Sequence, residues 1–203
     1  MRDYKADSRR YFDELAARYD RHYYGHHGRR QYQRVVRAAH GWSFSSVLDV
    51  GCGTGGLLAL LKRPRMKLAG ADISPKMIAE AHNRLGKAAD LRVADSEKLP
   101  WEAGTFDLVV TTDSFHHWPH PLQGMSEISR VLKKDGHLVV ADVTAPPLLR
   151  QLSNWLARFG KEGDVRVYSA GEFEQMLREV DFIEIKLEHL SLMAVVVSAK
   201  LGR

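Results

Sequence analysis

The 203-residue sequence predicts a doubly wound α/β fold of seven strands, with the last strand antiparallel and helices on both faces of the sheet. Three observations support this prediction. Short apolar runs alternate with segments of helical periodicity from residue 46 onward. These runs are nearly continuous rather than alternating in polarity, as in strands buried on both faces. Only a few residues separate the last two runs, which permits an antiparallel pair but excludes a helical crossover.

The chain is predicted to be one domain, in which residues 1–41 form a helical lid and residues 46–203 form the α/β core. Apolar residues at helical spacing mark a first, amphipathic helix: Tyr11, Phe12, Leu15, Ala16 and Tyr19. We expect the Gly-His-His-Gly segment at residues 25–28 to break this helix. A second helix should then run from about Arg30 to Ala39.

The net positive charge of the molecule lies in the lid segment. Residues 1–40 contain ten basic and five acidic side chains, which equals the whole net charge of +5. Such a segment can attract an anionic substrate, a nucleic acid or an acidic membrane surface. It is equally consistent with the solvated faces of two ordinary helices.

The elements of the core follow in order along the chain. The predicted strands are Ser46–Val50, Lys67–Asp72, Leu91–Ala94, Phe106–Thr111, His137–Asp142, Ile183–Glu188 and Leu192–Lys200. The predicted helices are Gly55–Lys62, Pro75–Leu85 with Ser74 as N-cap, Leu122–Leu132, and one capped by Ser169 that ends near Glu179. A further helix should place Trp155 and Phe159 on one face, where they roof a substrate cleft or pack in the core.

Composition narrows the class of protein. Hydrophobic residues make up 44% and charged residues 27%, as in an ordinary globular domain. The sequence has no apolar run near the about 20 residues that span a bilayer, and its charged start is unlike a secretory signal. Cys52 is the one cysteine, which excludes an internal disulfide and fits a reducing compartment. We therefore expect a cytoplasmic protein.

A glycine-rich loop follows the first predicted strand. Gly51, Gly53 and Gly56 fit the dinucleotide pattern G-x-G-x-x-G, in which glycines let the backbone approach a ligand at a helix N-terminus. Asp49 stands two residues before the first glycine. A buried carboxylate there would repel a pyrophosphate but favour a ligand that bears an ammonium and a sulfonium.

Two more acids end the next two strands. Asp72 lies about 20 residues past the glycines, at the position where a carboxylate accepts hydrogen bonds from ribose hydroxyls. Ile73 either lies against adenine or packs in the core. Asp95 ends the third strand, where it either contacts the nucleoside or caps the following turn.

The segment Val47–Gly55 resembles motif I of the class I S-adenosylmethionine-dependent methyltransferases, which have a Rossmann-like fold. The resemblance implies that Gly51, Cys52 and Gly53 wrap the methionine part of the cofactor and that Asp49 holds its amino group. It also places Asp95, followed by Ser96, against the exocyclic amine of adenine. Thr112, at the end of the fourth strand, is expected to line the cofactor side of the cleft.

Other segments resemble one branch of that superfamily, the ubiquinone and menaquinone C-methyltransferases. Phe115-His116-His117 is similar to a run that follows the fourth strand there, and Val131–Leu138 resembles V-L-K-P-G-G-x-L. Phe12 through Asp20 resembles an N-terminal F-D-x-x-A-x-x-Y-D helix that covers the cofactor, which makes Tyr19 a cofactor-binding residue. Residues 112–115 lack the N/D-P-P-Y/F motif of amine methylation, and residues 145–168 have no recognisable counterpart.

The resemblance implies methyl transfer from S-adenosylmethionine to a small, apolar or aromatic organic acceptor. Such a displacement depends on alignment in a water-poor site, and a base is needed only when the acceptor must lose a proton. His116 and His117 are the predicted catalytic residues, as base or in orienting the acceptor; a purely structural role is the alternative. His120 lies close by, but no Cys-x-x-Cys or His-Glu-x-x-His accompanies these histidines, so we predict no metal ion.

Three other functions compete with this one. The basic lid segment is compatible with methylation of RNA or protein, although we do not expect a nucleic-acid partner. A protein that binds S-adenosylmethionine without catalysis is the second rival. An NAD-dependent oxidoreductase is the third, and Asp49 and Asp95 disfavour it. The sequence does not predict the oligomeric state.

Overall fold

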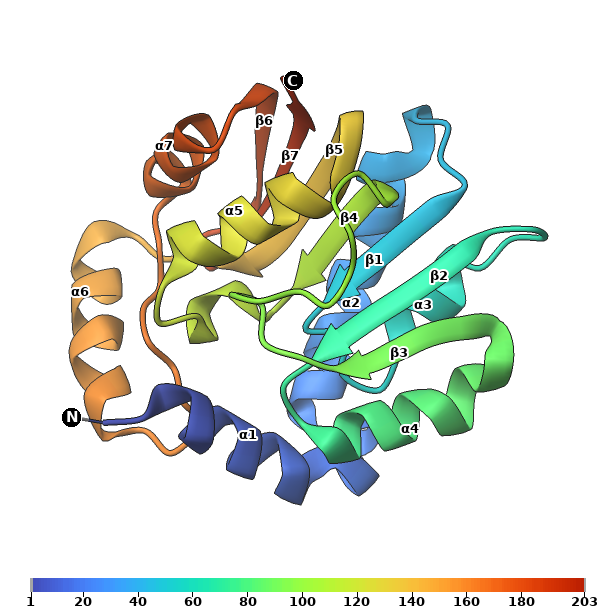
Figure 1. The fold of residues 1–203 in the computed structure, drawn as a ribbon. Helices are drawn as coiled ribbons and strands as arrows, with labels where there is room; N and C mark the ends of the chain where they lie inside the picture. Colours follow the sequence, from blue (N-terminus) through green and yellow to red (C-terminus); the bar gives the residue numbers. More distant parts are fainter. Residues whose placement is uncertain (1, 203) are drawn as a thin grey trace.

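The computed structural model describes residues 2–202, apart from the side chains of residues 23, 24 and 27. Within this range seven strands form one sheet in the order β3-β2-β1-β4-β5-β7-β6 (Figure 1). β7 runs antiparallel to both of its neighbours, whereas the other pairs are parallel. The predicted doubly wound sheet with a reversed last strand is confirmed. The strands are β1 (Ser46–Val50), β2 (Lys67–Asp72), β3 (Ala89–Val93), β4 (Phe106–Thr112), β5 (Leu132–Val143), β6 (Phe182–Ser191) and β7 (Ala194–Leu201).

Helices precede, connect and follow these strands. The α-helices are α1 (Tyr4–Leu15), α2 (Tyr23–Ala38), α3 (Gly56–Leu61), α4 (Pro75–Leu85), α5 (Pro121–Val131), α6 (Pro147–Leu156) and α7 (Ala170–Glu179). Short 3-10 turns are η1 (Ala16–Arg21), η2 (Ala39–Gly41), η3 (Gly86–Ala88), η4 (Phe115–His117) and η5 (Ala157–Phe159). Both expected caps are present: Ser74 accepts from the Met77 N–H with Pro75 in the first turn, and Ser169 forms a capping box with Glu172.

Each face of the sheet has its own hydrophobic core. α5 and α7 pack on one face, where Ile128 and Phe173 join a cluster with Phe115. α2, α3 and α4 pack on the other face, where Val35, Leu58 and Ala81 are fully or almost fully buried. β1, in the middle of the sheet, is buried at every position, whereas the edge strand β6 is mostly exposed. This pattern explains why the central strands were easiest to predict from apolar runs.

The N-terminal region differs from its prediction in one respect. Residues 25–28 do not break a helix but lie within α2, and the chain bends earlier, through η1 and the extended His22. The reason is packing, since Gly25 is buried where α2 meets η1. A Cβ atom there would lie 2.3 Å from the Tyr19 carbonyl oxygen.

The segment predicted as a lid, residues 1–41, therefore divides into two parts. α2 packs on the sheet with Val35 in the core. α1 and η1 instead lie beyond the carboxyl ends of the parallel strands, together with α6 (Figure 1). Only the first part, up to Arg21, is placed to cover a ligand.

α6 also differs from its prediction. Trp155 of α6 and Phe159 of η5 neither pack in the core nor line the cleft described below, because these residues are 55% and 71% exposed. The two rings contact each other edge to face at 5.3 Å between centroids. Among the described residues, no helix is both long and apolar enough to cross a membrane.

Candidate active site

A cleft lies at the carboxyl ends of β1, β2 and β4, under α1 and η1, where the sheet's connections reverse direction. Such a position is the usual ligand site of an open α/β sheet. All but three of the predicted site residues line it: Tyr19, Gly51, Gly53, Asp72, Ile73, Asp95, Ser96, Thr112 and His117. Asp49, Cys52 and His116 lie behind its wall.

The glycine loop forms the floor of the cleft and is held by Asp72. One carboxylate oxygen of Asp72 accepts from the Gly53 N–H and the other from the Ser74 N–H, each at 2.9 Å. Gly53 has a φ of +51°, and a Cβ atom on it would meet no atom within 4 Å. The loop therefore leaves an open cradle beside a carboxylate that still has lone pairs for ribose hydroxyls.

Burial dominates the electrostatics of this floor. It raises the pKa of Asp72 to about 6, although the Ser74 and Gly53 N–H groups oppose the rise. Burial and the neighbouring Asp72 charge raise the pKa of Asp49 to about 8. The Asp49 Oδ1 atom is buried without a hydrogen-bond partner in the described structure. Two buried carboxyl groups close together, one with an oxygen that lacks a hydrogen bond, would be stabilised by a positively charged ligand.

Cys52 contributes backbone rather than side chain to this region. Its N–H donates to the Ala71 carbonyl and its carbonyl accepts from Gly55 N–H, so both groups shape the turn. The thiol packs toward Gly70, where an added Cβ atom would lie 2.9 Å from the sulfur. Burial raises the pKa of this thiol well above its ordinary value, so it stays protonated.

The far end of the cleft is closed by the lid. Lys5 of α1 forms ion pairs with Asp95 at 2.6 Å and with Glu97 at 2.5 Å. Glu97 is almost completely buried, and its other oxygen accepts from the His120 N–H. Asp95 also caps its own turn by accepting from the Glu97 N–H, so both roles considered for Asp95 are compatible.

Two acids of the predicted F-D-x-x-A-x-x-Y-D segment lock the lid onto the core. Asp13 accepts from the Ser74 hydroxyl at 2.6 Å and from the Lys76 N–H. Asp20 accepts from the Thr54 hydroxyl at 2.9 Å and pairs with Arg84. These contacts hold Tyr19 over the glycine loop and explain the acids of the motif physically.

The two histidines of η4 have different surroundings. Nδ1 of His116 lies 2.7 Å from Oδ1 of Asp142, a carboxylate that is 1% exposed. Burial disfavours the charged imidazolium, but the charge and hydrogen bond of Asp142 outweigh it and raise the pKa of His116 to about 9. Burial and the nearby His116 charge lower the pKa of His117 to about 4. His117, which lines the cleft, is thus neutral, and Phe12 of the lid contacts its ring edge to face at 5.3 Å.

Three acids near these histidines were missed by the sequence analysis. Asp113 follows β4 with a φ of +49°, and burial and the Asp142 charge raise its pKa to about 7. Asp142 is the last residue but one of β5, so the rule that picked Asp49, Asp72 and Asp95 could have found it. Asp164 comes from residues 160–169, which have no periodic pattern, and nothing in the sequence marks it.

The core of the chain resembles known proteins. Residues 48–140 match the methyltransferase domain family. The chain carries a domain of the methyltransferase family. It is 36% identical to the ubiquinone/menaquinone biosynthesis C-methyltransferase of Desulfotalea psychrophila, over 66% of this chain and 57% of that protein. It is 33% identical to the 27-O-demethylrifamycin SV methyltransferase of Amycolatopsis mediterranei, over 66% of this chain and 52% of that one. The chain thus spans little more than half the length of these relatives.

A solved structure has the same fold as this chain. Phosphoethanolamine N-methyltransferase 2 of Haemonchus contortus, in complex with S-adenosylmethionine, superposes with a TM-score of 0.74 at 16% identity. The match covers 86% of this chain and 53% of that one. Together the comparisons confirm the predicted methyltransferase domain and its Rossmann-like fold. The glycine cradle and the paired acids described above fit S-adenosylmethionine, which that neighbour binds.

Proposed function

We propose that this methyltransferase transfers the methyl group of S-adenosylmethionine to a small, uncharged aromatic or apolar acceptor, at oxygen or at a conjugated carbon. One observation carries the proposal. Beyond the glycine loop the lining of the cleft includes Phe12, Trp118 and the neutral His117. Lys5 is the one lysine or arginine among the described lining residues, and it is paired with two carboxylates. Such a wall suits an uncharged aromatic ring.

The residues of the chain have distinct tasks in this reaction. The Gly51–Gly55 turn, Asp49 and Asp72 would hold the cofactor, and Asp95 would accept from adenine. When bound, S-adenosylmethionine supplies an electrophilic methyl group on a sulfonium. His117 faces the acceptor and orients it. The contact between His116 and Asp142 fixes the 3-10 turn that carries His117. The lid excludes water, which favours a displacement that disperses charge.

The names of the relatives support the same class of acceptor. One acts in ubiquinone and menaquinone biosynthesis on carbon, and another acts on 27-O-demethylrifamycin SV. Two basic side chains of the lid are engaged within the chain and are not free to bind RNA. Arg2 donates to the carbonyls of Ala157, Arg158 and Gly160, and Lys5 is paired with Asp95 and Glu97.

The test is turnover on defined acceptors. The full chain is incubated with S-adenosylmethionine and, separately, with a 1,4-hydroquinone, a catechol, an apolar amine and total RNA, and S-adenosylhomocysteine is quantified. We expect product with a phenolic or quinol acceptor and none with RNA. Methylation of RNA alone, lost steeply as salt is added, would show that the acceptor class is wrong. Tight cofactor binding with no turnover on any acceptor would indicate a regulator.

A further inference from the structure

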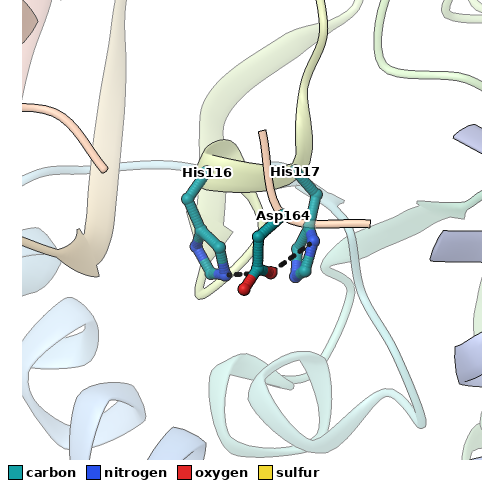
Figure 2. Close-up of side chains that lie close together, drawn as sticks. All are labelled: His116, His117 and Asp164. Atoms are coloured by element: carbon teal, nitrogen blue, oxygen red, sulfur yellow. Dashed lines mark ion pairs between the residues drawn. The ribbon is translucent and has the colours of Figure 1, made fainter. Parts of the chain in front are cut away.

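Three side-chain atoms that could bind a metal ion lie close together at the His117 side of the cleft. Nδ1 of His117 lies 3.2 Å from Oδ1 of Asp164, and Nε2 of His116 lies 3.8 Å from the same oxygen. All three atoms lie within 4.8 Å of one another. Figure 2 shows the two imidazoles on either side of the Asp164 carboxylate, which points between them.

Two of these atoms lack a partner although they are buried. Among the described residues, neither Nδ1 of His117 nor Oδ1 of Asp164 has a hydrogen bond. The distance between these two atoms would allow a hydrogen bond, but the angle at the nitrogen does not. A buried nitrogen and a buried carboxylate oxygen side by side without a hydrogen bond are costly to hold, and a cation bound between them would satisfy both.

Hydrogen bonds to neighbouring groups fix the positions of these three residues. The N–H groups of Val165 and Arg166 donate to the His116 carbonyl at 2.9 and 3.1 Å, which ties the Asp164 segment to the histidine turn. Asp142 holds Nδ1 of His116 at 2.7 Å and also accepts from the Phe115 N–H. A carboxylate on the far nitrogen of a histidine, with Nε2 turned toward the other donors, is the usual support of a metal-binding imidazole.

From this arrangement we propose that His116, His117 and Asp164 bind a divalent transition-metal ion at the wall of the cleft, next to His117. The ligands would be Nε2, Nδ1 and Oδ1, in that order. Two imidazoles and one carboxylate suit Zn²⁺, Co²⁺ or Fe²⁺ and leave further coordination positions open. A tetrahedral ion with bonds of about 2.0–2.1 Å separates its ligands by about 3.3 Å, so His117 and Asp164 are already at that spacing and His116 would move closer by a few tenths of an ångström. The sequence predicted no metal because Asp164 is remote from the histidines along the chain.

The ion has a chemical use at this position, and that part of the proposal rests on the proposed function. An acceptor hydroxyl that coordinates the ion becomes more acidic and releases its proton to water. Its oxygen, or the carbon conjugated to it, then forms the new bond to the methyl group as the bond from methyl to sulfur breaks. S-adenosylhomocysteine leaves with a neutral sulfur, so the reaction needs no oxidant or reductant.

The experiment is a metal titration of the full chain with no acceptor present. Chelator-treated protein is titrated with Co²⁺ while the visible d–d absorption is followed, and Zn²⁺ is then used to displace it. We expect one Co²⁺ per chain. Asp164→Ala should weaken binding at least tenfold, and Asp142→Asn should weaken it about 10–100-fold through His116. His189→Ala removes an exposed histidine of β6 and should change nothing.

Three outcomes would overturn the site: no saturation at one equivalent, unchanged affinity in Asp164→Ala, or equal losses in Asp164→Ala and His189→Ala. Asp164 is 35% exposed on a loop, so this variant should stay folded, and unchanged S-adenosylmethionine affinity verifies it. Metal binding without turnover on any acceptor would refute the proposed function and leave the site standing. Full turnover by chelated protein would remove only the ion's role in the reaction.

Discussion

Asp72 has two roles. Its carboxylate fixes the shape of the glycine loop, and it is placed to bind the cofactor ribose. Asp72→Asn keeps the size of the side chain but converts one acceptor oxygen into a donor that faces an N–H group. We expect S-adenosylmethionine binding to weaken by about 1–3 kcal/mol, measured by calorimetry. Asp135→Asn is the matched control, because Asp135 is exposed, far from the cleft, and has a φ of +59° that asparagine tolerates. Unchanged affinity in Asp72→Asn would refute the assigned role.

Asp49 should cost the ligand-free protein stability. Its pKa is about 3.9 in an unfolded chain and is raised to about 8 in the folded one by burial and by the Asp72 charge. Between these values the folded state binds more protons, so stability falls as the pH rises from about 4 to about 8. Tyr32 and Cys52 also face this carboxyl, but neither ionises in that range because burial raises both of their pKa values.

Asp49→Asn removes that cost and should therefore stabilise the ligand-free chain at pH 8.5. A gain of about 1 kcal/mol corresponds to a Tm rise of about 2–4 °C for a chain of this size. The gain should shrink toward pH 5, where the wild-type carboxyl is already protonated, while S-adenosylmethionine affinity is lost at both pH values. A Tm difference that does not depend on pH would contradict the raised pKa.

At the residue scale, the sequence predicted those site residues that a local rule marks. Asp72 and Asp95 follow apolar strands, and parallel strands bring their carboxyl ends to one edge of the sheet. The separate roles of His116 and His117 could not be predicted, because neighbouring residues on a 3-10 turn point differently and only packing decides which one faces the cleft. Asp164 reaches them through a tertiary contact that no spacing in the sequence encodes.

Among the elements, α1 behaves as a lid, and Lys5 is its direct link to the adenine end of the cleft. Lys5 spans Asp95, which is placed at the adenine end, and the buried Glu97. Lys5→Met should keep the apolar stem of the side chain but remove the ion pairs. Partly exposed pairs contribute about 0.5–1 kcal/mol, so S-adenosylmethionine should dissociate about two- to fivefold faster in stopped-flow measurements. Lys87→Met, at an exposed lysine of η3, is the control, and an equal effect there would exclude a latch.

The elements that were predicted less well are those whose place depends on other elements. Buried central strands and capped helices carry their own signals, as β1 and the Ser169 capping box show. Residues 25–28 looked like a helix break because glycine disfavours helices, but contact with η1 outweighs that local preference. The apolar face of α6 was expected to be covered, and helical spacing alone does not reveal what covers it.

On the scale of the whole molecule, the lid and the segment after α6 form one connected roof. Arg2 donates to the carbonyls of Ala157, Arg158 and Gly160, and Tyr11 donates to Glu162 at 3.3 Å. Gly163 packs so closely on α1 that an added Cβ atom would lie 2.6 Å from the Ser8 nitrogen. Two segments about 150 residues apart in sequence are thus in direct contact, and we expect them to move together.

This connection predicts a joint response to the cofactor. Addition of S-adenosylmethionine should slow amide hydrogen exchange in α1 and in residues 157–166 together, because ordering one element stabilises the other. Exchange in α7, which lies away from the cleft, should stay the same. Gly163→Ala should uncouple the two segments, since the added methyl group separates them. Protection of α1 alone in the wild-type chain would show that the roof is not one unit.

The contact between Ser8 and Gly163 has a kinetic consequence. Asp164 follows Gly163 directly, so a lid that lifts to admit the cofactor also carries away a side chain of the acceptor end. An acceptor that arrives first would find its half of the cleft incomplete. Turnover should therefore follow a compulsory order, with S-adenosylmethionine on first and S-adenosylhomocysteine off last.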